Sequence, residues 1–133
     1  MNIFWKNSLL IILFVIQFSA RSQEKTDSIF SDFKVQSIER IKNGFVIDVS
    51  DVKDSAWYTI ASGRGKHYKY PELEVDKVYK LKLSPRSSII EFPNLGVIYL
   101  VEIKGKTLSI KSRSWTVEIF RTNNIIGKYY KAP

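Results

Sequence analysis

Two patterns in the 133-residue chain predict an all-β protein. Apolar and polar residues alternate with a period of two through most of the chain after residue 32, where β-branched and aromatic residues are also frequent. No segment of the sequence after residue 22 carries a convincing helical apolar stripe over several turns. About seven to eight short antiparallel strands at this spacing predict a small single-domain barrel or a sandwich.

A hairpin is predicted at Asn43-Gly44, a dipeptide that supplies the two φ > 0 positions of a type I′ turn. Its strands are expected at residues 33–42 and 45–49. Alternation places three side chains of the second strand toward the core and the two between them on the opposite face: Phe45, Ile47 and Val49 inward, Val46 and Asp48 outward.

Further strands are expected at residues 56–61, 78–83, 96–104, 106–111, 115–121 and 125–130. In the strand 78–83 the alternation is clean, with Tyr79, Leu81 and Leu83 inward and Lys80 and Lys82 outward. The strand 96–104 is apolar on both faces at its centre, which predicts burial on both sides.

The N-terminal residues have the layout of a secretory signal peptide. Lys6 supplies a positive charge, residues 9–18 are almost wholly apolar, and the small residues Ala20 and Ser22 suit cleavage before Gln23. An uncleaved anchor is the alternative, although a membrane-spanning helix needs about 20 apolar residues. We therefore expect a signal peptide at 1–22, a mobile lead-in at 23–32 and one domain at 33–133, with no transmembrane span after cleavage.

The chain has no cysteine and is basic. A structural disulfide, a thiolate metal site and a lipidated cysteine are therefore excluded, and we expect a soluble product in a bacterial periplasm or outside the cell. Loss of Lys6 and Arg21 with the signal peptide leaves 19 cationic against 13 acidic residues, a net charge of +6. Residues 104–131 carry seven cations and a single acid, Glu118. This indicates a basic face that attracts polyanions, with solubility alone as the other explanation.

The order of the first strands resembles that of OB-fold proteins. The expected strands 33–42, 45–49, 56–61 and 78–83 are similar to the β1-β2-β3 meander and later β4 of OB barrels, over about half of the mature chain. The sequence departs from the family in residues 62–76, where two glycines and a proline stand in place of a helix, and in extra strands toward the C-terminus. The resemblance implies binding of oligonucleotides or oligosaccharides.

The segment 62–71 (SGRGKHYKYP) is the main candidate for a binding site. Cations attract an anionic polymer and planar side chains stack on its bases or sugars, so we expect the loop to share a rim with the outward lysines of 78–83. The candidate residues are Arg64, Lys66, His67, Tyr68, Lys69, Tyr70, Lys80 and Lys82. A solvated connection between two strands is the alternative. Trp57 and Trp115 would extend such a platform, but their apolar strands favour burial in the core.

Other chemistries find weaker support. The loop glycines are too close together for a phosphate-binding P-loop, and His67 stands where that motif needs Ser or Thr. In a hydrolase, His67 would act as the general base and Glu72 or Glu74 would orient it. Glu72 and Glu74 are two residues apart and are expected on one face of a strand, as in a two-carboxylate hydrolase. The oxygen-rich segment 48–54 lacks the glycine and terminal glutamate of a calcium loop, and a single histidine makes a poor zinc site. We expect no metal and no cofactor.

Three functions remain open. The first is a non-enzymatic module that binds an anionic partner, namely an envelope glycan, an anionic membrane surface or an acidic protein, with nucleic acid less favoured in an exported setting. The second is a structural or accessory subunit of an envelope complex, suggested by apolar residues expected at the surface: Ile98, Leu100, Ile125 and Ile126. The third is a small hydrolase that uses His67 with Glu72 or Glu74.

Overall fold

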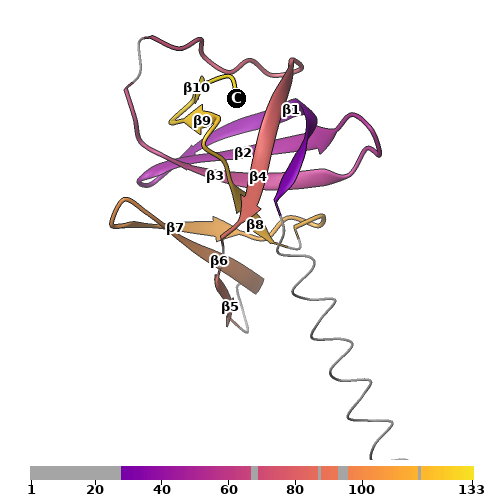
Figure 1. The fold of residues 1–133 in the computed structure, drawn as a ribbon. Helices are drawn as coiled ribbons and strands as arrows, with labels where there is room; N and C mark the ends of the chain where they lie inside the picture. The colour runs from indigo at the N-terminus through magenta and orange to yellow at the C-terminus, as the bar shows by residue number, and fades with distance from the viewer. Residues whose placement is uncertain (1–27, 67–68, 87, 93–95, 117) are drawn as a thin grey trace, which may run out of the picture.

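The computed structural model describes residues 28–66, 69–86, 88–92, 96–116 and 118–133, so the expected signal peptide lies outside the described residues. Five strands close into a barrel in the order β1-β2-β3-β8-β4 (Figure 1). They are β1 (Ile29–Ile41), β2 (Gly44–Asp51), β3 (Trp57–Gly63), β4 (Val78–Pro85) and β8 (Ile119–Arg121). The all-β prediction is confirmed, and of its two architectures the barrel is the one observed.

The barrel has Greek-key connectivity. Strands β1, β2 and β3 form an antiparallel meander, and β4 returns to pair with β1. The short β8 closes the barrel, parallel to β3 and antiparallel to β4. Strand β1 begins at Ile29, inside the expected lead-in 23–32, because residues 29–34 pair with residues 78–83, a long-range contact that no local pattern reveals.

One of two apolar clusters fills the barrel. Its buried side chains come from every barrel strand: Phe33, Val35, Ile47, Val49, Ile60, Tyr79, Leu81, Leu83 and Phe120. The predicted alternation of residues 78–83 is confirmed, since Lys80 and Lys82 are exposed between the buried residues of β4. Burial of one such aliphatic side chain contributes roughly 1.5–3 kcal/mol, so this cluster is a main source of the barrel's stability.

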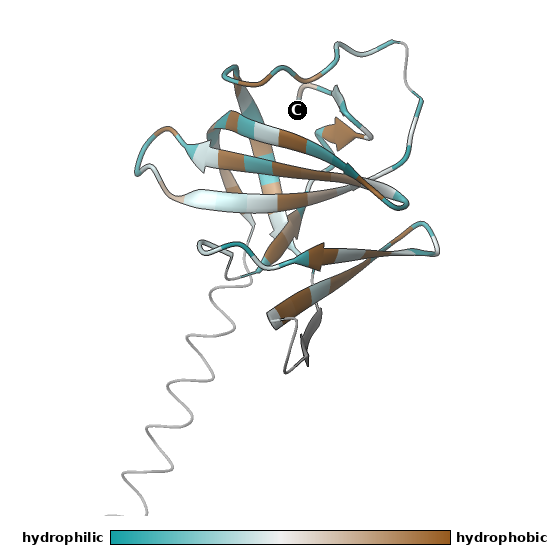
Figure 2. Ribbon diagram, turned by 180° about the vertical axis from the view of Figure 1, so that it is seen from behind, coloured by the Kyte–Doolittle hydropathy of each residue, from teal (hydrophilic) through white to brown (hydrophobic). Residues whose placement is uncertain are grey.

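A second sheet is inserted between β4 and β8. It consists of β5 (Ser88–Phe92), β6 (Gly96–Ile103) and β7 (Lys106–Lys111) and accounts for the extra strands of the sequence. The sheet lies against the outside of the barrel beside β3 (Figure 1, Figure 2). The contact is the second apolar cluster, formed by Val46, Ala61, Tyr99, Val101, Ile103, Leu108, Ile110 and Ile119.

The inserted sheet changes two burial predictions. Val46 and Asp48 are predicted on the face opposite the core, yet both are buried, Val46 beneath the inserted sheet. The prediction that β6 is buried on both faces is wrong, because only its barrel-facing side is fully buried. Its other face keeps Ile98 and Leu100 partly exposed.

The hairpin between β1 and β2 is present, but its turn differs from the prediction. Ile41 pairs with Gly44, which leaves Lys42 and Asn43 as the loop residues. Asn43 adopts the left-handed conformation (φ 71°) and Gly44 does not. The predicted type I′ turn centred on Asn43-Gly44 is therefore wrong.

The C-terminal strands are shorter than predicted. Among the described residues of the expected strand 115–121, only those of β8 form a strand, and Trp115 lies in a turn in which the Thr116 amide donates to the Arg113 carbonyl. The expected strand 125–130 is instead a small hairpin of β9 (Ile125–Ile126) and β10 (Tyr129–Tyr130). Its turn contains Gly127 at φ 61°, in the left-handed region that glycine tolerates best.

Candidate functional site: a basic groove

Asn124 anchors the C-terminal hairpin to the barrel. Its buried side chain donates from Nδ2 to the Lys131 carbonyl (3.1 Å) and accepts at Oδ1 from the Lys82 amide (2.9 Å). The Tyr130 hydroxyl adds a bond to the Lys80 carbonyl at 3.0 Å. These bonds fix the hairpin beside β4.

The same hairpin also lies against the loop that follows β3. A Cβ atom at Gly127 would be 2.8 Å from the Gly65 carbonyl oxygen, so only glycine permits this approach. The hairpin therefore sits next to both β4 and the loop 64–66, and cationic side chains from all of these segments gather around it.

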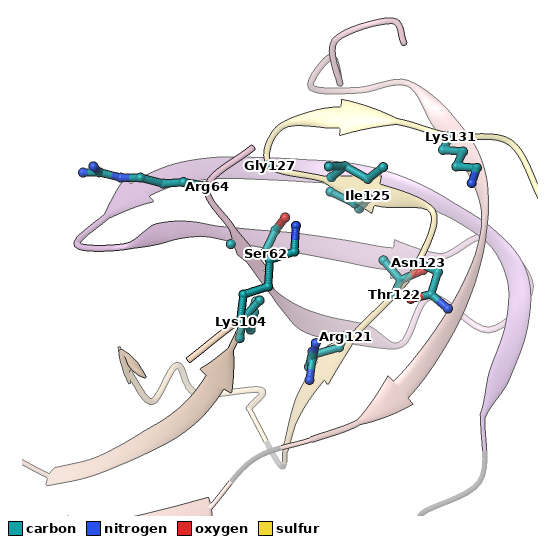
Figure 3. A pocket seen from close by; sticks show the side chains of 13 residues that line it. Ser62, Arg64, Lys104, Arg121, Thr122, Asn123, Ile125, Gly127 and Lys131 are labelled. Carbon is teal, nitrogen blue, oxygen red and sulfur yellow. The ribbon is translucent and has the colours of Figure 1, made fainter. Parts of the chain in front are cut away.

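A hollow of about 400 Å³ lies between this hairpin, the end of β3, the β6–β7 turn and the end of β8. Four cationic residues line it: Arg64, Lys104, Arg121 and Lys131. Figure 3 shows Lys104, Arg121 and Lys131 around the hollow, with the Arg64 side chain extending away from it. Ser62, Thr122 and Asn123 add neutral hydrogen-bonding groups.

Two further hollows lie beside this one and share lining residues with it. One of about 390 Å³ shares Arg121, Thr122 and Asn123 with it, and another of about 510 Å³ shares Arg64. We call the three together the basic groove. Its cationic lining consists of nine residues: Arg40, Arg64, Lys66, Lys82, Arg86, Lys104, Arg121, Lys128 and Lys131.

No acidic side chain is among the described residues that line the basic groove. Of its cations, Lys128 forms an ion pair with Glu72 outside the lining (2.8 Å). Hollows lined mainly by one sign of charge concentrate the electric field and raise the local concentration of counter-ions. The arrangement is therefore suited to holding an anionic ligand.

The predicted loop and lysines are only partly in this groove. Arg64, Lys66 and Lys82 line it, whereas Lys69, Tyr70 and Lys80 do not. The Lys80 ammonium lies 5.8 Å from the centre of the Phe30 ring instead. The remaining candidates, His67 and Tyr68, lie outside the described residues.

Sequence reasoning did not select the other six cations of the groove. Arg40, Arg86, Lys104, Arg121, Lys128 and Lys131 come from distant parts of the chain. The one available signal was the excess of cations in residues 104–131, which contribute four of the nine. That excess does not show which of these cations share a surface, since Lys106 and Lys111 are exposed on β7 instead.

The carboxylates proposed for hydrolysis are engaged in separate ion pairs. The Glu72 backbone forms an isolated β-bridge with Tyr129, and its side chain forms an ion pair with Lys128. The Glu74 side chain forms an ion pair with Lys77. These hydrogen bonds raise the pKa of Lys128 and Lys77 above the ordinary lysine value. The prediction that Glu72 and Glu74 share a strand face is wrong, because only Glu72 takes part in any β-bridge.

Two carboxylates of the oxygen-rich segment 48–54 accept hydrogen bonds from other groups of the chain. Asp48 accepts from Thr59 at Oδ1 (2.8 Å) and from Ser37 at Oδ2 (3.0 Å). Asp51 accepts from the Ser31 hydroxyl and from the Lys53 amide, both at 2.9 Å. Among the described residues, no three His, Cys, Asp or Glu side chains are grouped as a metal site would require.

The two tryptophans of the proposed platform pack on each other. Their ring centres are 4.8 Å apart with the planes tilted by 59°. Trp57 at the start of β3 is 40% exposed, so its expected burial in the core is wrong, while Trp115 is partly buried. Neither residue is among those that line the basic groove.

The apolar residues that suggested an accessory subunit are not fully exposed. Ile125 is buried in the barrel cluster, and Ile98, Leu100 and Ile126 are partly buried. Among the residues whose burial the structure describes, the exposed large apolar side chains are Phe30, Val52, Trp57, Val75 and Val78.

The described part of the chain contains no helix with the length and apolar character needed to cross a bilayer. Comparisons with protein-family models, with curated proteins and with solved structures find no match to this chain. Its function must therefore be inferred from the residues of the site.

Proposed function

We propose that this protein is a non-enzymatic exported β-barrel that binds an anionic partner through the basic groove. The observation that supports this most is the lining itself, whose described residues include nine cations and no acidic side chain over three neighbouring hollows. Such a surface attracts anions over long distances and holds them at close range. Glu72 and Glu74, the carboxylates of the hydrolase alternative, are each paired with a different lysine.

We also infer that the barrel belongs with the OB-folds, which are five-stranded Greek-key barrels. In support, the β1-β2-β3 meander and β4 are present, and a fifth strand closes the barrel. OB-folds commonly bind ligands on the face of the second and third strands. Here the inserted sheet covers that face at Val46 and Ala61, so the ligand surface that we propose lies beside it.

The test compares two triple variants with the same loss of charge. The groove variant Arg64→Gln, Lys82→Gln, Lys131→Gln removes one or more cations from each hollow. The control Lys53→Gln, Lys106→Gln, Lys111→Gln removes three exposed cations that do not line the groove. Retention on immobilised heparin is measured across a salt series for both variants and for the unmodified protein.

We expect the unmodified protein and the control to bind heparin similarly at low salt. Three exposed charge contacts of about 0.5–1 kcal/mol each predict that the groove variant binds roughly tenfold more weakly or worse. Equal losses in the two variants would mean that net charge alone causes retention. Flow-through of the unmodified protein at low salt would refute the proposed function.

A further inference from the structure

We propose that the anionic partner is a linear acidic polysaccharide that lies along the basic groove. This inference rests on the function proposed above and narrows its ligand to one chemical class. Three properties of the groove support it: the adjacency of its three hollows, its neutral polar lining and one exposed aromatic ring.

The adjacency of the three hollows favours an extended ligand. The central hollow shares Arg64 with the hollow on one side and Arg121 with the hollow on the other. A small anion would satisfy the cations of one hollow and leave those of the other two without a counter-ion. A linear polyanion places charges in all three hollows, and linked contacts raise the total affinity well above that of a single site.

The neutral lining favours a ligand with many hydroxyl groups. Ser62, Thr122 and Asn123 line the central hollow, and Ser28 and Ser84 line the hollow that contains Lys82. Hydroxyl and amide side chains both donate and accept hydrogen bonds. They can therefore bind the hydroxyl groups of a sugar chain while the cations bind its acidic groups.

Phe30 provides an apolar surface in the hollow that contains Lys82. Its side chain is 55% exposed on β1, directly opposite Lys82 in the β1–β4 pairing. An exposed aromatic ring beside a cation offers the apolar face of a pyranose a surface to stack on while an adjacent acidic group meets the charge.

The other polyanions match these features less well. Single-stranded nucleic acid is held by successive aromatic platforms, whereas the described lining of the central hollow contains no aromatic residue. The aromatic residues of the two outer hollows are Phe30 on one side and Phe45 and Tyr129 on the other. A planar membrane surface does not follow a recessed groove, and the cations here line hollows.

The test titrates the protein with heparin-derived oligosaccharides of increasing length. A single-stranded DNA of matched charge and phosphatidylglycerol vesicles serve as the competing ligand classes. We expect the affinity to rise by about tenfold or more from a disaccharide to a chain that spans all three hollows, and then to level off. The longest oligosaccharide is expected to bind more tightly than the DNA or the vesicles.

Two further variants test the aromatic contact. Phe30→Ala is expected to weaken binding of the long oligosaccharide severalfold, whereas Val78→Ala, which changes an equally exposed residue of the neighbouring strand, leaves it unchanged. Thermal unfolding of both variants checks that each is folded. Equal effects of the two substitutions would overturn the role of Phe30.

The outcomes separate the two proposals. An affinity that does not rise with chain length, or tighter binding of DNA or vesicles, would overturn the proposal that the ligand is a polysaccharide. The proposal that the groove binds anions would still stand. Absence of binding to all three ligand classes at low salt would overturn the proposed function as well.

Discussion

Gly44 lies where the backbone of β2 approaches that of β3. A Cβ atom at this position would be 2.1 Å from the Ser62 carbonyl oxygen and 2.8 Å from Leu108 in the inserted sheet. Backbone atoms cannot move aside as the end of a flexible side chain can. Glycine is therefore required here by packing, while Asn43 takes the left-handed conformation of the turn.

We predict that Gly44→Ala destabilises the protein by about 3 kcal/mol, because overpacking against backbone costs this much or more. Gly105→Ala is the comparison, since Gly105 has a φ of 76° and a Cβ atom added there would meet nothing within 4 Å. Gly105→Ala is expected to lower the folding stability by about 1–2 kcal/mol, because of the backbone conformation alone. Urea denaturation of both variants measures the difference, and a smaller loss for Gly44→Ala would contradict this role.

The Asn43-Gly44 dipeptide predicted the hairpin correctly, but the predicted reason for glycine at position 44, a positive φ in the turn, was wrong. Turn preferences depend on neighbours in the chain, and these placed the hairpin correctly. The close approach to Ser62 depends on how β2 pairs with β3, which is a long-range property. Trp57 shows the same limit, because its exposure depends on which residues distant in sequence, such as Trp115, pack against it.

Arg113 connects the inserted sheet to the barrel. It follows β7 and reaches Asp48 on β2 (Nε to Oδ2, 3.4 Å) and Glu39 on β1 (Nη2 to Oε2, 2.8 Å). The Asp48 side chain is buried, so the guanidinium supplies charge compensation that solvent does not. Asn43 adds a bond to the Thr107 carbonyl in β7 (3.2 Å).

Removal of Arg113 is expected to loosen the inserted sheet. Arg113→Met leaves the Asp48 carboxylate without its cation, which we predict to cost about 2–3 kcal/mol of folding stability. The addition of Asp48→Asn removes the buried charge and is expected to recover part of this loss. Lys111→Met, a substitution of an exposed residue on β7, is the control, and its folding stability should stay within about 0.5 kcal/mol of that of the unmodified protein. Denaturation curves of these variants and of Asp48→Asn alone measure the differences, and additive losses in the double variant would contradict the coupling.

The strands themselves were largely predictable, whereas most of the long-range contacts between them were not. The alternation of residues 78–83 gives β4 its inward and outward faces directly. The order of the strands 33–83 led to a barrel, which the structure confirms. The packing of β5–β7 on the outside of β2 and β3 has no local signature, so the burial of Val46 and the one-sided burial of β6 were missed.

The basic groove is assembled by the complete fold from segments that are far apart in sequence. Its cations come from β1, the loop after β3, β4, the residue that follows it, the β6–β7 turn, β8 and the C-terminal hairpin with its following residue. Composition indicated a basic face, and barrel closure determines which cations share it. Arg64, Lys66 and Lys82 are the residues on which the sequence and the groove agree.

Binding in the basic groove is tested most directly by mapping the ligand on the protein by NMR. Amide chemical shifts are followed while an acidic oligosaccharide is titrated into the labelled protein at low salt. We predict that the largest shifts occur at groove residues, such as Arg64, Lys82, Lys104, Arg121 and Lys131. Shifts centred on Lys53, Lys106 and Lys111, or spread evenly over all exposed cations, would contradict binding in the groove.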